Sequence, residues 1–288
     1  MSSPNSESRI LAPIVILVRP QMGENIGAVA RAMSNFGLSE LRLVAPRDGW
    51  PNSKAKKTAS GAESLIESAK LYPDFTSAIA DIHIAYATTA RPRDMEKRVV
   101  EPEEAMREIS AMIRSSDHPI IGSAIKTALV FGPERAGLEN EEITWCDTLI
   151  TIPTAENHSL NLAQSAVILG YEWRKRSGEW LVASGEEEKE SKETTHHSPL
   201  ATRHLATLQN WQGLFNQLES YLDEINYYRV AHKKPAMWQN LKTMLLRARF
   251  SDQEVRTFRG MLRSLWERRV RNEDNIVKTK DKNDLFYD

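Results

Sequence analysis

Asn25 and Arg31 belong to a segment whose residue types suit contact with a phosphate or a ribose. Read as a helix capped near Asn25 and ended by Gly37, it buries an apolar stripe formed by Ile26, Val29, Ala30 and Met33. Gly27 and Arg31 are four residues apart and would share the opposite side. A helix face with small side chains near its start, followed by one guanidinium, allows close approach of an anion. An exposed arginine on a surface helix gives the same pattern, and the segment alone favours that simpler interpretation.

Two further segments place ligand-binding groups directly after predicted strands. Val130–Leu138 carries glycines on both sides of a Pro-Glu-Arg sequence, which predicts a tight loop whose amides and carbonyls can face a ligand. A Gly-Pro loop is also common where no ligand binds. Ile152–Ala163 leaves a strand through Pro153, crosses a polar loop and enters a helix at Ser159. Ser159 is a candidate helix cap, and the free amides of a helix start are also a candidate ligand site.

Short apolar runs rich in β-branched residues alternate with helical patterns up to a helix over about 159–177. The predicted strands are Ile14–Val18, Leu41–Val44, Ile82–Thr88, Thr127–Phe131 and Thr148–Ile152. Because these runs do not alternate between apolar and polar residues, they require cover on both faces, which predicts a parallel α/β sheet. Ligands bind such sheets at the carboxyl ends of the strands, where all three segments lie.

The sequence lacks the signatures of several other site classes. It has no Walker loop, no Gly-x-Gly-x-x-Gly after the first strand and no Gly-x-Ser-x-Gly around Ser159, which disfavours P-loop, NAD-dependent and hydrolase chemistry. His83 and His158 have no second ligand at metal spacing, so we expect no metal site. Cys146 is the single cysteine, which excludes an intramolecular disulfide and indicates a reducing compartment, the cytoplasm.

Length and composition predict two folded units. With 288 residues, 41% of them apolar, the chain can hold one α/β domain and a smaller second unit. The apolar stretch Ile10–Val18 is too short to cross a membrane, so we expect no membrane association. The expected organisation is a disordered tail (1–12), the α/β domain (13–178), a flexible linker (179–202), a helical RNA-binding extension (203–272) and a polar tail (273–288).

The extension reads as three helices. Apolar residues recur at helical spacing over Leu205–Ile225, a second helix is expected over about Trp238–Arg249, and Ser251 with Glu254 forms a capping box at the start of a third. The chain's net charge of −1 conceals a strong excess of Lys and Arg between residues 229 and 271. Arg256, Arg259 and Arg263 fall on one helix face, which favours a surface that follows RNA phosphates over an ordinary solvated face.

The three segments, in this order and at these spacings, resemble the three motifs of SPOUT methyltransferases of the TrmH group, and most closely the TrmJ family of tRNA ribose 2′-O-methyltransferases. The similarity covers about 13–176 and continues more weakly through Met237–Lys242 and Phe258–Leu262. It implies a Rossmann-like parallel sheet with a carboxyl-terminal trefoil knot, an exception to the rule against knots. It also implies a homodimer that uses S-adenosyl-L-methionine.

The resemblance further assigns roles to individual positions. Arg31 would be catalytic, supported by Asn25, and Ser159 could take part in proton transfer. Residues expected to contact the methyl donor are Thr88, Thr89, Ala90, Gly132, Glu134, Ile152, Ser159, Leu160 and Asn161. Arg91 and Arg93 would lie near the RNA. Arg31 could act as a general base or, as we favour because a guanidinium releases its proton reluctantly, as an electrostatic stabiliser.

The function that the resemblance implies is methylation of a cytidine or uridine ribose 2′-OH in the tRNA anticodon loop, at nucleotide 32. An rRNA ribose 2′-O-methyltransferase would share every catalytic residue. A catalytically silent SPOUT protein that only binds RNA is a third interpretation, disfavoured because Asn25, Arg31, Glu134, Ser159 and Asn161 are all present.

Overall fold

A computed structural model describes residues 12–90, 97–116, 125–155, 159–177 and 205–284. Arg91 and Arg93 lie outside the described residues, as do the predicted linker and almost all of the predicted amino-terminal tail. In the described part of the chain, no helix is both long enough and apolar enough to cross a membrane.

The centre of the molecule is a seven-stranded sheet in which every pairing is parallel. Its order is β3-β2-β1-β6-β4-β7-β5. The strands are β1 (Ile14–Val18), β2 (Leu41–Val44), β3 (Lys70–Tyr72), β4 (Ile84–Thr88), β5 (Arg98–Val100), β6 (Thr127–Phe131) and β7 (Thr148–Ile150). The five predicted strands are all present, with ends that differ by at most two residues. The two edge strands, β3 and β5, were not predicted because they are short and mostly exposed.

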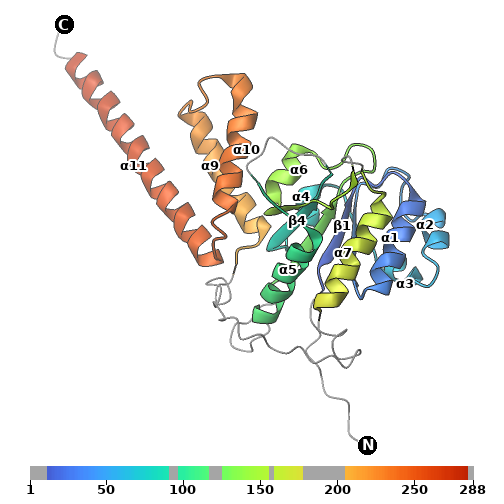
Figure 1. The fold of residues 1–288 in the computed structure, drawn as a ribbon. Helices are drawn as coiled ribbons and strands as arrows, with labels where there is room; N and C mark the ends of the chain where they lie inside the picture. Colours follow the sequence, from blue (N-terminus) through green and yellow to red (C-terminus); the bar gives the residue numbers. More distant parts are fainter. Residues whose placement is uncertain (1–11, 91–96, 117–124, 156–158, 178–204, 285–288) are drawn as a thin grey trace, which may run out of the picture.

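Helices cover both faces of the sheet, in two separate apolar clusters. One face packs against α1 (Gly23–Asn35), α5 (Pro102–Ser116) and α7 (Leu162–Arg176) (Figure 1). The other packs against α4 (Phe75–Ala78), α6 (Asn140–Trp145) and helices of the carboxyl-terminal region. The short helices α2 (Ser53–Thr58) and α3 (Glu63–Glu67) lie beside α1.

The structure corrects two helix starts. In α1 the predicted stripe is buried, but the helix begins at Gly23 and Asn25 is not its cap. Gly27 does not share an open face with Arg31, because a Cβ at Gly27 would lie 2.3 Å from the Ala55 carbonyl oxygen of α2. Helix α7 is capped by Asn161, not by Ser159: the Asn161 Oδ1 accepts the Ala163 N–H at 2.9 Å.

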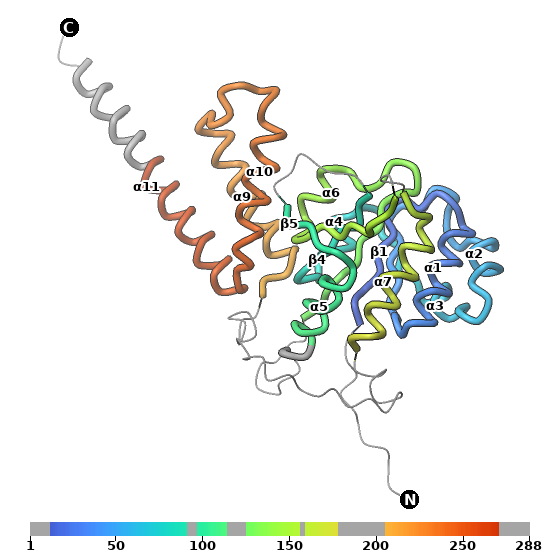
Figure 2. Tube along the Cα trace, viewed as in Figure 1, coloured from blue at the N-terminus to red at the C-terminus, as the bar shows by residue number. Residues whose placement is uncertain are grey.

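The carboxyl-terminal region forms α9 (Leu208–Glu224), η3 (Ala231–Lys233), α10 (Lys234–Leu246) and α11 (Asp252–Asp284). The predicted capping box is confirmed, since the Glu254 N–H donates to the Ser251 hydroxyl and the Glu254 carboxylate accepts the Ser251 N–H. Helix α11 lies beside α9 (Figure 2), with the Trp266 ring of α11 stacked on Tyr221 of α9.

These helices dock on the sheet through an aromatic seam, which we define as Trp145, Trp211, Phe215, Trp238 and Phe250. Neighbouring rings of the seam are 5.3–5.9 Å apart between centroids. Trp211 is 3% exposed and belongs to the same apolar cluster as Ile16 of β1. The helical region therefore packs directly on the sheet and completes the cover of one of its faces.

Candidate functional site

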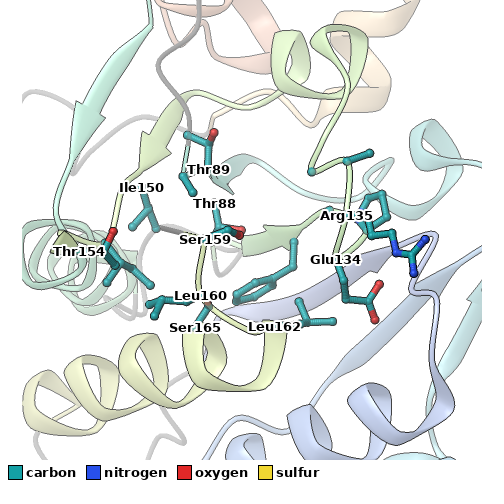
Figure 3. Close-up of a pocket in the computed structure, with 17 residues that line it drawn as sticks. Thr88, Thr89, Glu134, Arg135, Ile150, Thr154, Ser159, Leu160, Leu162 and Ser165 are labelled. Atoms are coloured by element: carbon teal, nitrogen blue, oxygen red, sulfur yellow. The ribbon is translucent and has the colours of Figure 1, made fainter. Parts of the chain in front are cut away.

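A cavity of about 300 Å³ opens at the carboxyl ends of β4, β6 and β7, against the start of α7 (Figure 3). This is the edge at which parallel sheets bind ligands. Its lining combines apolar, hydroxyl and backbone groups: Thr88, Thr89, Ala90, Phe131, Gly132, Pro133, Glu134, Arg135, Ala136, Gly137, Ile150, Ile152, Thr154, Ser159, Leu160, Leu162 and Ser165. Loops from both predicted binding segments therefore meet in one place.

The loop after β6 closes tightly on itself at Gly132. A Cβ at this position would lie 2.3 Å from the Leu138 amide nitrogen and 2.4 Å from the Gly137 carbonyl carbon. Gly137 itself has φ +69°, a backbone conformation that residues other than glycine rarely adopt. The turn is held by a hydrogen bond from the Gly137 N–H to the Pro133 carbonyl oxygen, 2.8 Å. Two glycines are thus required for the loop that forms this cavity wall.

Glu134 connects the cavity to the start of α1. Its two carboxylate oxygens accept hydrogen bonds from the Asn25 side-chain amide at 2.7 Å and from the Gln21 N–H at 2.9 Å. Asn25 thus contacts the cavity wall through Glu134. The contact fixes the first predicted segment to the second across more than a hundred residues of sequence.

Hydroxyl groups line the opposite wall. The Thr88 hydroxyl donates to the Val130 carbonyl oxygen at 3.1 Å, and the Thr89 N–H donates to the Ile150 carbonyl oxygen at 3.0 Å. These bonds hold the end of β4 between β6 and β7. Ser159 is exposed at the cavity, and Figure 3 shows it between the β4 residues and Leu160.

The structure adds lining residues that the sequence interpretation did not assign. Thr154 belongs to the predicted third segment, Arg135 follows Glu134 directly, and Ser165 lies one helical turn beyond Asn161. Ser165 could have been found from the four-residue spacing once the helix start was correctly placed. Asn161 is not among the lining residues, because its side chain caps α7.

Arg31 is exposed and does not line the cavity of its own chain. It lies six residues beyond Asn25 on α1, about 9 Å along the helix axis and about a third of a turn around it. Of the three predicted RNA-binding arginines of α11, Arg256 and Arg263 are exposed. Arg259 is partly buried, and its Nε donates to the Gln217 side chain of α9 at 3.2 Å.

Apart from Glu134 and Arg135, the cavity is lined by neutral polar and apolar groups. Within the described ranges, no three His, Cys, Asp or Glu side chains are placed to hold a metal ion. Hydroxyls, loop amides and aliphatic side chains suit a ligand with an uncharged ring and polar edges.

Comparison with known proteins identifies the family. Residues 12–171 match the SpoU rRNA methylase family, and residues 209–275 match the tRNA methyltransferase TrmJ C-terminal domain. A tRNA (cytidine/uridine-2′-O-)-methyltransferase TrmJ from Pectobacterium atrosepticum is 33% identical over 252 residues, which cover 87% of this chain and 95% of that protein. The chain belongs to the SpoU methylase family and, within it, to the TrmJ family.

Other TrmJ proteins show the same extent of similarity. A tRNA (cytidine/uridine/adenosine-2′-O-)-methyltransferase TrmJ from Pseudomonas aeruginosa is 32% identical over 250 residues, 86% of this chain and 91% of that protein. The crystal structure of TrmJ from Z. mobilis ZM4 aligns with a TM-score of 0.73 and 36% identity, covering 88% of this chain and 99% of that one. The TrmJ match confirms the SPOUT sheet with a helical carboxyl-terminal region. The trefoil knot and the roles of individual residues stay predictions.

Proposed function

We propose that this TrmJ-family chain transfers a methyl group from S-adenosyl-L-methionine to a ribose 2′-OH of tRNA, on the cytidine or uridine at nucleotide 32 of the anticodon loop. The observation that carries the proposal is the cavity formed where the loops after β4, β6 and β7 meet. The TrmJ relatives of similar length are named as tRNA 2′-O-methyltransferases, which supports tRNA as the substrate.

The cavity residues fit this methyl donor. Its adenine is an uncharged aromatic ring, which suits the aliphatic side chains of Ile150, Ile152 and Leu160 and the amides of a glycine-dependent loop. Thr88, Thr89 and Ser159 can bind its polar edges. When bound, the donor supplies a methyl group already activated by its sulfonium.

The chain's own residues must then orient the ribose and stabilise charge on the 2′-oxygen. We assign the stabilising charge to Arg31, whose guanidinium can bind an RNA phosphate in two-point fashion while opposing negative charge on the attacking oxygen. The proton of the 2′-OH leaves to water or to an RNA phosphate, either directly or through the exposed Ser159 hydroxyl, which accepts it while passing its own proton on. Glu134 holds the Asn25 end of α1 against the cavity wall.

Because Arg31 does not line its own cavity, we propose that a second copy supplies it, in a homodimer. The surface of α1 and α7 exposes Met22 (46%), Val167 (43%) and Tyr171 (53%), a set of large apolar side chains that a second copy could cover. An isologous contact there would carry Arg31 of each chain toward the other chain's cavity.

The dimer proposal is tested by mixing two impaired variants, assayed at a methyl-donor concentration well below KM so that weaker donor binding lowers the rate. Arg31→Ala and Gly132→Ala chains, unfolded and reassembled together, should regain about a quarter of wild-type turnover, since half of random dimers are mixed and each mixed dimer has one intact composite site. Each variant reassembled alone is the control. No recovery in a sample shown to contain mixed dimers would place Arg31 in its own chain's site.

The substrate class is tested with labelled methyl donor and separated RNA pools. The expected result is alkali-resistant label in tRNA and little in ribosomal RNA. Label confined to ribosomal RNA would favour the rRNA methyltransferase alternative. A silent RNA-binding protein would transfer no label and could show no thermal stabilisation by S-adenosylhomocysteine.

A further inference from the structure

The connection between α9 and α10 forms a rigid tip at the same end of the molecule as the cavity. In Figure 1 the tip of this hairpin lies beyond α6, toward the end of the sheet at which α7 begins. The cavity lies at that end, since Ser159 and Leu160 directly precede α7. RNA that enters the cavity from this end of the sheet can therefore extend toward the hairpin tip.

The backbone of the tip is fixed by a Schellman motif at the end of α9. Asn226 has φ +53° and its N–H donates to the Asp223 carbonyl oxygen at 2.9 Å, while the Tyr227 N–H donates to the Leu222 carbonyl oxygen at 2.9 Å. The Arg229 N–H then donates to the Tyr227 carbonyl oxygen at 3.1 Å. The backbone of Tyr227 is thus held in place before any ligand arrives, which lowers the entropy cost of a contact with this residue.

Tyr227 presents an aromatic surface to solvent. It is 49% exposed, and its ring packs edge to face on Tyr228, with centroids 5.1 Å apart and an angle of 82°. Tyr228 is 7% exposed and lies under the Lys234 ammonium, 5.5 Å from the ring centroid. Tyr228 therefore forms a fixed wall, and the Tyr227 ring is the part available to a partner.

The charge around Tyr227 indicates what that partner is. Arg229, His232 and Lys233 are exposed, and none of them forms an ion pair with another residue in the described part of the chain. Asp223 is paired with Lys234 at 2.7 Å, which leaves Glu224 as the acidic neighbour. An exposed aromatic ring among unpaired cations is the combination that binds unstacked nucleotides, since the ring stacks on a base and the cations bind phosphates.

We propose that the hairpin tip holds an unpaired tRNA nucleotide, with its base stacked on Tyr227 and its phosphates bound by Arg229 and Lys233. The inference rests on the proposed function, because a 2′-OH in an anticodon loop reaches the cavity only if neighbouring loop nucleotides are free to leave their stack. The tip is then a positioning site, separate from the cavity where methyl transfer occurs.

The ring is tested by three substitutions in the full-length protein. Tyr227→Leu and Tyr227→Ala should raise KM for tRNA about tenfold with little change in kcat, whereas Tyr227→Phe should keep the wild-type KM. Affinity for S-adenosylhomocysteine should not change in any of them. Met244→Ala, at a residue 58% exposed on α10 away from the tip, is the matched control.

The charges are tested by the salt dependence of tRNA binding. Arg229→Gln with Lys233→Gln should flatten the slope of log Kd against log salt by about one to two, while Tyr227→Leu should leave the slope unchanged. Wild-type KM in Tyr227→Leu, or a wild-type salt slope in the double variant, would overturn the inference while tRNA methylation stands. If Tyr227→Leu instead changes the protein's concentration-dependent oligomeric state, the tip is a protein contact and the inference is also wrong. Absence of methylation by the wild-type protein would instead refute the proposed function.

Discussion

The cavity and the aromatic seam lie on the same sheet but differ in what they do with their side chains: the cavity keeps polar groups accessible, and the seam buries aromatic rings. The cavity leaves hydroxyls and loop amides open, and it depends on a loop in which Gly132 cannot accept a Cβ. The seam buries large rings against each other and encloses even a cation, Lys242, which is 7% exposed between Trp145 and Trp238. Burial lowers the pKa of Lys242.

This contrast separates the residues that bind ligands from those that hold the protein together. Few side chains of the cavity wall are needed to fill space, so changes there should reduce activity more than stability. Seam residues make no contact with the cavity, so their loss should reduce stability and affect activity only through the amount of folded protein. Four substitutions test that division, in order of expected effect.

Trp211→Ala should cost about 3–5 kcal/mol of unfolding free energy, because it removes a buried indole that stacks on Phe250. Urea unfolding measures the change. Trp266→Ala is the matched control, since Trp266 stacks on Tyr221 but is only partly buried, and its loss should cost less. Equal costs for the two variants would mean that the seam is not what secures the helices.

Arg31→Ala should lower turnover about 100-fold to 1000-fold, corresponding to loss of one electrostatic stabiliser of the reacting oxygen. Affinity for S-adenosylhomocysteine and the unfolding midpoint should stay near wild type, because Arg31 is exposed and does not line the cavity. Arg107→Ala, at an exposed arginine on α5, is the control. A loss of cofactor affinity as large as the loss of rate would contradict the role assigned to Arg31.

Gly132→Ala should weaken S-adenosylhomocysteine binding about tenfold, equal to about 1.4 kcal/mol. The added methyl group collides with loop backbone, which cannot move aside as a flexible side chain would. Calorimetric titration gives the affinity. Gly260→Ala, where a Cβ meets nothing within 4 Å, should bind as the wild type does. Unchanged affinity in Gly132→Ala would remove the loop from the binding site.

His83→Asn should have the smallest effect, visible only in the pH dependence of stability. Burial lowers the pKa of His83, which lies where the start of α9 and the end of α10 meet the sheet, and its Nδ1 accepts the Lys126 N–H at 3.1 Å. The neutral form is favoured on folding, so this contribution is present above the unfolded pKa of about 6.5 and is lost as the pH falls below it. When the pH is lowered from 7.5 to 5.5, the Tm of the wild type should fall by about one or two degrees more than the Tm of His83→Asn. A difference of this size is expected for a weak effect from one titrating group. Parallel pH profiles for the two proteins would show that His83 does not contribute.

Sequence patterns predicted the parts of the fold that are apolar throughout. Central strands such as β1 and β6 are buried on both faces, and their unbroken runs of mostly apolar residues predict this burial. Edge strand β5 is exposed at Arg98 and Val99, so it carries no comparable signal. The amphipathic pattern of α9 predicted a buried face, but a stripe does not specify its partner, and docking on the sheet could not be foreseen.

The candidate site was predictable in its loops and less so in its details. Both Ser159 and Asn161 can cap a helix, and the choice depends on Gln164, which completes a capping box only with Asn161. The capping-box signal is present in the sequence. The close packing of Gly27 on α2 could not be predicted from the sequence, because it arises from tertiary contact between two segments.

The most direct test of ribose 2′-O-methylation at nucleotide 32 uses a tRNA that lacks one oxygen atom. Two ligated transcripts are compared, identical except that one carries a 2′-deoxynucleotide at position 32. We expect the wild-type protein to methylate the ribose transcript to about one methyl group per tRNA and the deoxy transcript not at all, although both bind equally well. Equal methylation of the two transcripts would contradict this expectation.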